Sequence, residues 1–351
     1  MNKDLLVVNL FVHDMKAPLA VIGSGADRLQ SGSTVSDEAG SQEELIQEIL
    51  NENHSALVLL NQILKMDNAA VPIQAVEPGT TGSKSKQGVF RQMAAALFET
   101  RKKCAPSDLF NAIQSLDSHL IKILNAIDVL RRHKRFDTSG GEGDVTLQRM
   151  RRNVKTAIHY AQNALAVLKD HGEEKQISSC RIADIIQPAM VEVFDLLDPV
   201  VSEQARSADS LARLTRILNQ KEVGLQISED QWDQKIEADP DKIKQVIVNL
   251  LINAMKFRKM RIEVKAEIDT CQVTISVVDD GQGIAEKDRQ FVFKNRFQVK
   301  SADDFPIRGH GIGLAGAQAL LEGQNGYLAL DDAPGGYTRF SAVLKQAIPE
   351  S

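Results

Sequence analysis

A histidine and an aspartate stand side by side near the N-terminus, in His13-Asp14-Met15-Lys16-Ala17-Pro18-Leu19. Imidazole is a nucleophile that can accept a phosphoryl group, and a neighbouring carboxylate can orient the ring or take its proton. Pro18 removes a backbone donor about one turn later, which predicts a bend in a helix at this point. His13 and Asp14 are therefore the candidate catalytic pair.

A second group of residues, far along the chain, has the side chains of a nucleotide site. Asn249 and Asn253 share one face of a predicted helix, with Lys256 one turn further. Asn253 can offer an amide oxygen to Mg²⁺, and Lys256 can approach phosphates as a point charge. Alone, this helix also fits an ordinary polar face.

A strand that ends in Asp279 is the next part of this predicted site. Its carboxylate can accept a hydrogen bond from the exocyclic amine of adenine. Glycines follow it and recur before a later helix, where they let the backbone approach a ring or a phosphate: Gly281, Gly283, Gly309, Gly311 and Gly313. Each glycine motif alone is also a common turn signal.

The combination, in this order, resembles the N, G1, F and G2 boxes of the histidine-kinase catalytic domain, over about Val223 to Leu344. That domain belongs to the GHKL ATPase superfamily, which includes gyrase and mismatch-repair ATPases. The motif around His13 resembles the H box of the same kinases. The chain is thus identified as similar to sensor histidine kinases, with a HisKA-type phosphoacceptor hairpin.

The resemblance implies a role for each matching residue. Asn253 would be the Mg²⁺ ligand and Asp279 the adenine reader, while Asn249 and Lys256 would support the nucleotide. The five glycines would shape the pocket and its lid. The implied activity uses ATP and Mg²⁺ to phosphorylate His13, and then transfers the phosphoryl group to an aspartate in the receiver domain of a separate response regulator.

Two other functions remain open. An ATP-binding signalling scaffold with weak or lost kinase activity would use its helices to recruit partners, and a gyrase-type ATPase would release phosphate independently of His13. Ala17 stands where bifunctional kinases often carry Thr or Asn, which puts phosphatase activity in doubt.

The other histidines are expected to be structural. His119 lies in the corresponding helix of the second hairpin but lacks the acidic neighbour and the proline. His310 falls in the predicted lid loop, and no partner follows from the spacing of His54, His133, His159 and His171.

The elements that position these residues fall into two halves. The fold class is multidomain, with an all-α bundle of two tandem helical hairpins followed by an α+β GHKL ATP-binding sandwich with a mixed sheet. Heptad seams of apolar residues predict the hairpins, and short β-rich runs predict the sandwich. The expected segments are a phosphoacceptor hairpin (1–67), a linker (68–87), a degenerate hairpin (88–172), a helical connector (173–221) and the catalytic domain (222–346).

Net charge, apolar run length and cysteine content limit the possible partners and location of the protein. The net charge of −5 gives no global basic field for nucleic acid, and the apolar run near the N-terminus is too short to span a membrane. Three widely spaced cysteines fit a cytoplasmic protein. About a dozen residues precede His13, which predicts either a longer parent protein or input from a separate sensor. Because four seams occur in one chain, we expect a monomeric pseudo-dimer, with an ordinary homodimer as the alternative.

Overall fold

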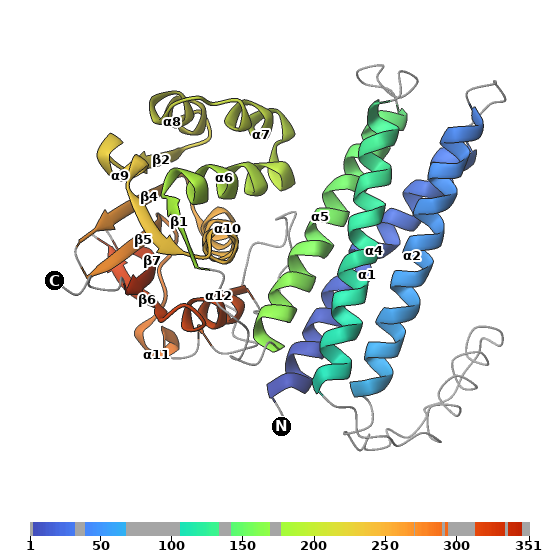
Figure 1. Cartoon of the computed structure of the whole chain (residues 1–351), viewed down its shortest axis with the longest axis horizontal. Helices are drawn as coiled ribbons and strands as arrows, with labels where there is room; N and C mark the ends of the chain where they lie inside the picture. The colour runs from blue at the N-terminus through green and yellow to red at the C-terminus, as the bar shows by residue number, and fades with distance from the viewer. Residues whose placement is uncertain are drawn as a thin grey trace.

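The computed structural model describes residues 3–31, 39–67, 106–132, 142–168, 177–269, 271–289, 292–293, 313–333 and 336–345. The predicted linker, residues 88–105 of the predicted degenerate hairpin and the glycines Gly309 and Gly311 lie outside these ranges. Within them, a helical bundle occupies one side of the molecule and an α/β unit the other (Figure 1).

The bundle contains four long helices from one chain: α1 (Lys3–Ser31), α2 (Ala39–Asp67), α4 (Pro106–Arg132) and α5 (Glu142–Leu168). Both α1 and α4 pack against α2 and α5, so the two hairpins enclose a single core. The predicted seams supply that core, with Met15, Ile49, Leu116 and Val154 all fully buried. The sequence prediction that four seams close one bundle is confirmed.

Pro18 lies within α1, and the helix continues through it to Ser31. A proline cannot donate the helical hydrogen bond to the residue four positions earlier, which here is Asp14. Pro18 thus changes the backbone hydrogen bonding next to His13 without ending the helix.

The α/β unit is built on a five-stranded sheet in the order β2, β4, β5, β7, β6. Its strands are β2 (Val223–Gln226), β4 (Ile262–Ile268), β5 (Gln272–Asp279), β6 (Gly326–Ala333) and β7 (Tyr337–Lys345). β2 pairs with β4 in parallel and the other neighbours are antiparallel, which confirms the predicted mixed sheet. The sequence did not predict β6 or the separate pair of β1 (Ser178–Arg181) with β3 (Lys235–Ala238).

Seven helices accompany the sheet among the described residues: α6 (Ala183–Leu197), α7 (Pro199–Arg206), α8 (Leu211–Asn219), α9 (Glu229–Asp233), α10 (Pro240–Phe257), α11 (Glu286–Arg289) and α12 (Gly313–Glu322). Carboxylates begin two of them as N-caps. Asp198 accepts hydrogen bonds from the first turn of α7, and Asp239 accepts one from the backbone N–H of Lys242 in α10.

A layer of helices lies between the sheet and the bundle (Figure 1). α10 packs on β5, α6 and α12 flank α10, and α12 also packs against α5. The helix predicted to carry the asparagines is therefore held between the sheet and the second hairpin. Among the described helices, none has the length and apolarity to cross a membrane.

Candidate active site

Asp279 occupies the last position of β5, where it was predicted. The residue is only 4% exposed, and its Oδ1 accepts a hydrogen bond from the backbone N–H of Gly281 at 2.9 Å. Burial raises the pKa of the Asp279 carboxyl to about 6. A buried acceptor at the end of a central strand suits recognition of an amine on a flat ring.

The next residue, Asp280, fixes the chain that leaves α10. Its carboxylate accepts hydrogen bonds from the backbone N–H groups of Lys259 at 2.9 Å and Met260 at 3.0 Å. Burial raises the pKa of Asp280, but these backbone donors outweigh it and hold the pKa below its usual range. The end of α10 is thereby tied to the turn that follows Asp279.

Two of the predicted glycines are required by close backbone approaches. A Cβ on Gly281 would lie 2.5 Å from Asp279 Oδ1 and 2.6 Å from the carbonyl oxygen of Phe257, closer than atoms tolerate. Gly283 adopts a φ of +74°, which disfavours any side chain. The Asp-Gly turn therefore lies directly against the C-terminal end of α10.

Gly313 begins α12, and a Cβ there would lie 3.2 Å from Asn249 Oδ1. The start of this helix thus adjoins the asparagine face of α10. Asn253 and Lys256 are half-buried on α10. Gly281 and Asp279 therefore lie at the C-terminal end of α10, and Gly313 lies beside Asn249 on the same helix, which also carries Asn253.

These residues fit the nucleotide and ion that the motifs imply. Asp279 is a buried acceptor, and the backbone of Gly281 packs directly against it because Gly281 has no side chain. A neutral amide oxygen such as that of Asn253 is a suitable ligand for Mg²⁺ that also contacts phosphate. The assignment of each residue to ATP or Mg²⁺ stays a prediction.

Lys256 connects this region to the helical bundle. Its Nζ lies 5.4 Å from the centre of the Phe257 ring. Burial lowers the pKa of the Lys256 ammonium, and the negative charge of Asp14 on α1 acts in the opposite direction. The lysine of the nucleotide site therefore lies within electrostatic range of the carboxylate beside His13.

His13 and Asp14 differ sharply in exposure. The His13 side chain is 68% exposed and that of Asp14 is 2% exposed, with His13 Nδ1 3.8 Å from Asp14 Oδ1. On the α5 side, burial raises the pKa of the Tyr160 hydroxyl, and the charge of Asp14 raises it further. The imidazole is open to an incoming group, while its carboxylate neighbour is enclosed between α1 and α5.

The surroundings of His119 agree with the prediction that this residue is structural. Its Nδ1 forms a close ion-pair contact with Glu52 of α2, and Lys122 Nζ lies 3.2 Å from the same carboxylate. The contact joins the two hairpins at α2 and α4. His119 therefore contributes to assembly of the bundle.

A polar cluster that the sequence did not predict lies between α5 and α10, and the expectation that His159 lacks a partner is wrong. Asn163 Nδ2 donates to His159 Nε2 at 3.0 Å and to Asn249 Oδ1 at 3.0 Å. Asn249 Nδ2 donates back to Asn163 Oδ1 at 2.7 Å. The separation of four residues between His159 and Asn163 was the available signal, but the partner on α10 is 86 residues away.

Known proteins resemble part of this chain. Residues 238–348 match the family described as histidine kinase-, DNA gyrase B-, and HSP90-like ATPase. Over 130 residues the chain is 28% identical to the signal transduction histidine-protein kinase ArlS of Staphylococcus haemolyticus, covering 36% of this chain and 26% of that protein. Over 101 residues it is 30% identical to the sensor histidine kinase CpxA of Escherichia coli K12, covering 29% and 22%.

Among solved structures, full-length ShkA in complex with AMPPNP aligns with 70% of this chain and 47% of its own, at 19% identity and a TM-score of 0.45. The chain spans about a quarter of the length of ArlS and CpxA.

Proposed function

Because the chain is related to the sensor histidine kinases and carries a GHKL-type ATPase domain, we propose that it is an ATP-dependent protein-histidine kinase that phosphorylates its own His13. The observation that supports this most directly is the placement of Lys256. The negative charge of Asp14, the neighbour of the exposed His13, acts on the ammonium of Lys256 near the end of the nucleotide helix α10.

The chain's residues would divide the work of binding ATP. Asp279 would accept a hydrogen bond from the adenine amine, and Gly281 and Gly283 would leave room for the ring. Asn253 would hold a Mg²⁺ ion, which would neutralise phosphate charge. Asn249, Lys256 and the glycines Gly309, Gly311 and Gly313 would support the phosphates and shape the lid.

The transfer step would use the exposed ring of His13. An imidazole nitrogen forms a bond to the γ-phosphorus of ATP as the bond from that phosphorus to the β-phosphate oxygen breaks, and ADP leaves. With Nδ1 facing Asp14, the buried carboxylate would orient the ring and take up its proton. Positioning and charge neutralisation then account for most of the catalysis, as in other phosphoryl transfers.

The phosphohistidine would pass its phosphoryl group to an aspartate of a separate response regulator. In that reaction the P–N bond breaks as a carboxylate oxygen binds phosphorus, and the imidazole takes up a proton. We also propose that the protein works in the cytoplasm and takes its input from a sensor, either on the same parent chain or as a separate protein.

Labelled ATP tests this function. After incubation with ATP labelled at the γ-phosphate, we expect an acid-labile, base-stable label on the protein. His13→Gln should abolish the label. His119→Gln should keep it, because His119 is paired with Glu52 and lacks the H-box motif.

Other outcomes would identify a different activity. ATP binding without any label would favour the signalling scaffold, since the second hairpin offers helical surface for partners. Phosphate release that persists in His13→Gln, again without label, would identify a gyrase-type ATPase.

A further inference from the structure

Helix α5 is buried on more than its bundle seam. The seam residues Val154, Ala157, Ala161 and Ala164 are fully buried, as in any heptad-packed helix. A second row, spaced four residues apart, faces the α/β unit: Arg151, Lys155, His159 and Asn163. Residues four apart share one helix face, so this row forms a continuous stripe.

At one end of the stripe, Asn163 binds α10. It exchanges two hydrogen bonds with Asn249, at 2.7 and 3.0 Å, and accepts a longer one from Gln245 at 3.4 Å. Both asparagines are 2% exposed. Burial lowers the pKa of His159 to about 4, so its neutral ring can accept the second Asn163 N–H. All the hydrogen-bonding groups of the Asn163 amide are thus used.

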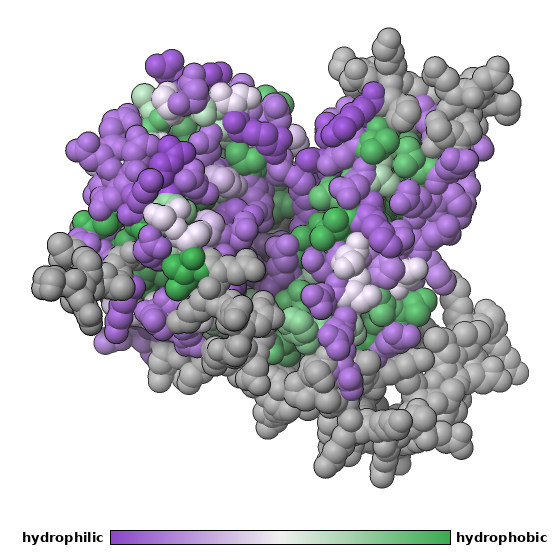
Figure 2. Space-filling view, viewed as in Figure 1, coloured by the Kyte–Doolittle hydropathy of each residue, from purple (hydrophilic) through white to green (hydrophobic). Residues whose placement is uncertain are grey.

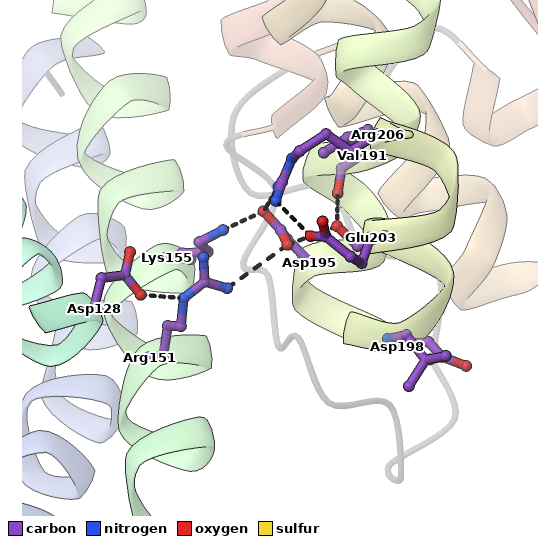
Figure 3. Close-up of polar contacts among 10 residues, drawn as sticks. Asp128, Arg151, Lys155, Val191, Asp195, Asp198, Glu203 and Arg206 are labelled. Atoms are coloured by element: carbon purple, nitrogen blue, oxygen red, sulfur yellow. Dashed lines mark hydrogen bonds and ion pairs between the residues drawn. The ribbon is translucent and has the colours of Figure 1, made fainter. Parts of the chain in front are cut away.

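At the other end, Lys155 and Arg151 bind Asp195 of α6 (Figure 3). Lys155 Nζ makes a close contact with Asp195 Oδ2, and Arg151 Nη1 lies 3.6 Å from Oδ1. Arg151 also pairs with Asp128 of α4 at 2.6 Å, so the contact is anchored in both helices of the second hairpin. Burial raises the pKa of Asp195, but Lys155 and Ser202 outweigh it and lower the pKa.

Between α5 and α6 the surfaces separate. A groove of about 530 Å³ is lined by Lys155, Ile158 and Gln162 on one wall and by Gln187, Val191 and Asp195 on the other. Figure 2 shows the corresponding hollow between the two halves of the molecule. On this side the α/β unit is therefore held by a few polar contacts and not by a continuous apolar interface.

We propose that the α5 stripe is a built-in docking surface for the ATP-binding unit, with Asn163 and Lys155 as positioning residues. The second hairpin, which lacks an H-box motif, thereby holds the nucleotide site facing His13 on α1, the helix that packs beside α5. This inference rests on the proposed kinase function. It gives the second hairpin the role of directing phosphorylation to the first.

The two ends of the stripe are suited to this role. When the two surfaces separate, water can form hydrogen bonds with the polar groups at each end of the stripe, so docking is reversible. Each is also specific, because a buried amide or carboxylate that loses its partner carries a desolvation cost. The net gain from even one such hydrogen bond corresponds to about five- to tenfold in a docking equilibrium.

Four variants of the full chain test the proposal. Asn163→Leu and Lys155→Met each remove one end of the stripe. Asn153→Leu is the matched control on the same helix, where the amide donates to the carbonyl of Arg149 at 2.8 Å within α5. Lys155→Arg is the rescue variant, because it keeps a cation for Asp195.

We expect Asn163→Leu and Lys155→Met each to slow autophosphorylation at saturating ATP by about five- to tenfold. In Lys155→Met the KM for ATP should stay within about twofold, since its partner Asp195 is not among the residues proposed to bind ATP. Small-angle scattering should show a larger radius of gyration. Asn153→Leu and Lys155→Arg should behave like the unchanged protein.

Unchanged rates and an unchanged radius in both variants would overturn the docking role and leave the kinase assignment intact. An equal loss of rate in Asn153→Leu would also overturn it, because any change in α5 would then suffice. If the unchanged chain takes no label, the kinase function fails separately. Scattering then decides docking alone, and no expansion in either variant would refute it.

Discussion

At the scale of single residues, Asp279 and Asp280 are adjacent carboxylates with opposite titration behaviour. Burial raises the pKa of Asp279 to about 6. Asp280 has its pKa lowered, because the backbone donors around it outweigh its burial. Folding therefore disfavours the charged form of Asp279 and favours the charged form of Asp280.

The sign of each contribution follows from proton binding. The Asp279 carboxyl binds its proton more tightly in the folded protein than in the unfolded chain, so its ionisation lowers the free energy of unfolding. That cost grows as pH rises from about 4 to about 6 and is complete above it. Asp280 instead stabilises the fold above about pH 4, and this contribution is lost as pH falls.

We expect Asp279→Asn to remove a destabilisation of at most about 3 kcal/mol that the unchanged protein acquires between about pH 4 and 6. Asp280→Asn should lower the unfolding free energy at pH 7, with the difference shrinking toward low pH. Urea unfolding followed by the fluorescence of Trp232 measures both, because this single tryptophan is buried in the α/β unit. Parallel pH profiles for the two variants would contradict the assignment.

The sequence predicts the local chemistry of this site better than its surroundings. The positions of Asp279, Gly281 and Gly283 follow from a strand that ends in a glycine turn, which is information within a few residues. The partnership of Asn249 with Asn163 depends on how two distant helices meet. Heptad spacing identifies the seam of α5 but gives no sign of what its other face contacts.

At the scale of elements, the close approach of α1 to α5 depends on a glycine. A Cβ on Gly25 would lie 2.5 Å from both Cγ and Sδ of Met150, whose side chain is fully buried. Alanine is favoured over glycine in a helix by about 1 kcal/mol, whereas overpacking a core costs about 1 to 3 kcal/mol. The balance between these two effects decides the outcome of a substitution.

We expect Gly25→Ala to destabilise the bundle by about 1 kcal/mol in the unchanged protein. In a Met150→Ala background the same change should stabilise it, because the clash is gone and the helix preference remains. Thermal unfolding followed by circular dichroism gives all four values of this cycle. An equal effect of Gly25→Ala in both backgrounds would show that α1 and α5 do not meet there.

Local sequence patterns decide which helices and strands can be predicted. β4, β5 and β7 have strongly apolar, β-branched runs, and α10 has a proline and a capping carboxylate at its start, so all four have a clear local pattern in the sequence. β1 and β3 are four residues long and mostly polar, and they pair across more than fifty positions. A strand stabilised mainly by such a distant partner leaves little local pattern.

At the scale of the whole molecule, one chain supplies both hairpins and a single ATP-binding unit. That unit follows α5 in the sequence, and α5 packs beside α1, which carries His13. Lys256 already lies within electrostatic range of Asp14 of the same chain. The proposed transfer to His13 can therefore occur within one chain, without the second copy that would complete a bundle of single hairpins.

Mixing two inactive variants tests this arrangement. His13→Gln keeps the nucleotide residues, and Asp279→Asn keeps the acceptor histidine, so a dimer that exchanged chains would restore labelling. We expect the mixture to take no more label than either variant alone. For the unchanged protein, the rate per chain should not depend on protein concentration. Restored label in the mixture, together with a dimer at low concentration by sedimentation, would show that the ATP-binding unit of a partner chain phosphorylates His13. The second hairpin would then need a different explanation.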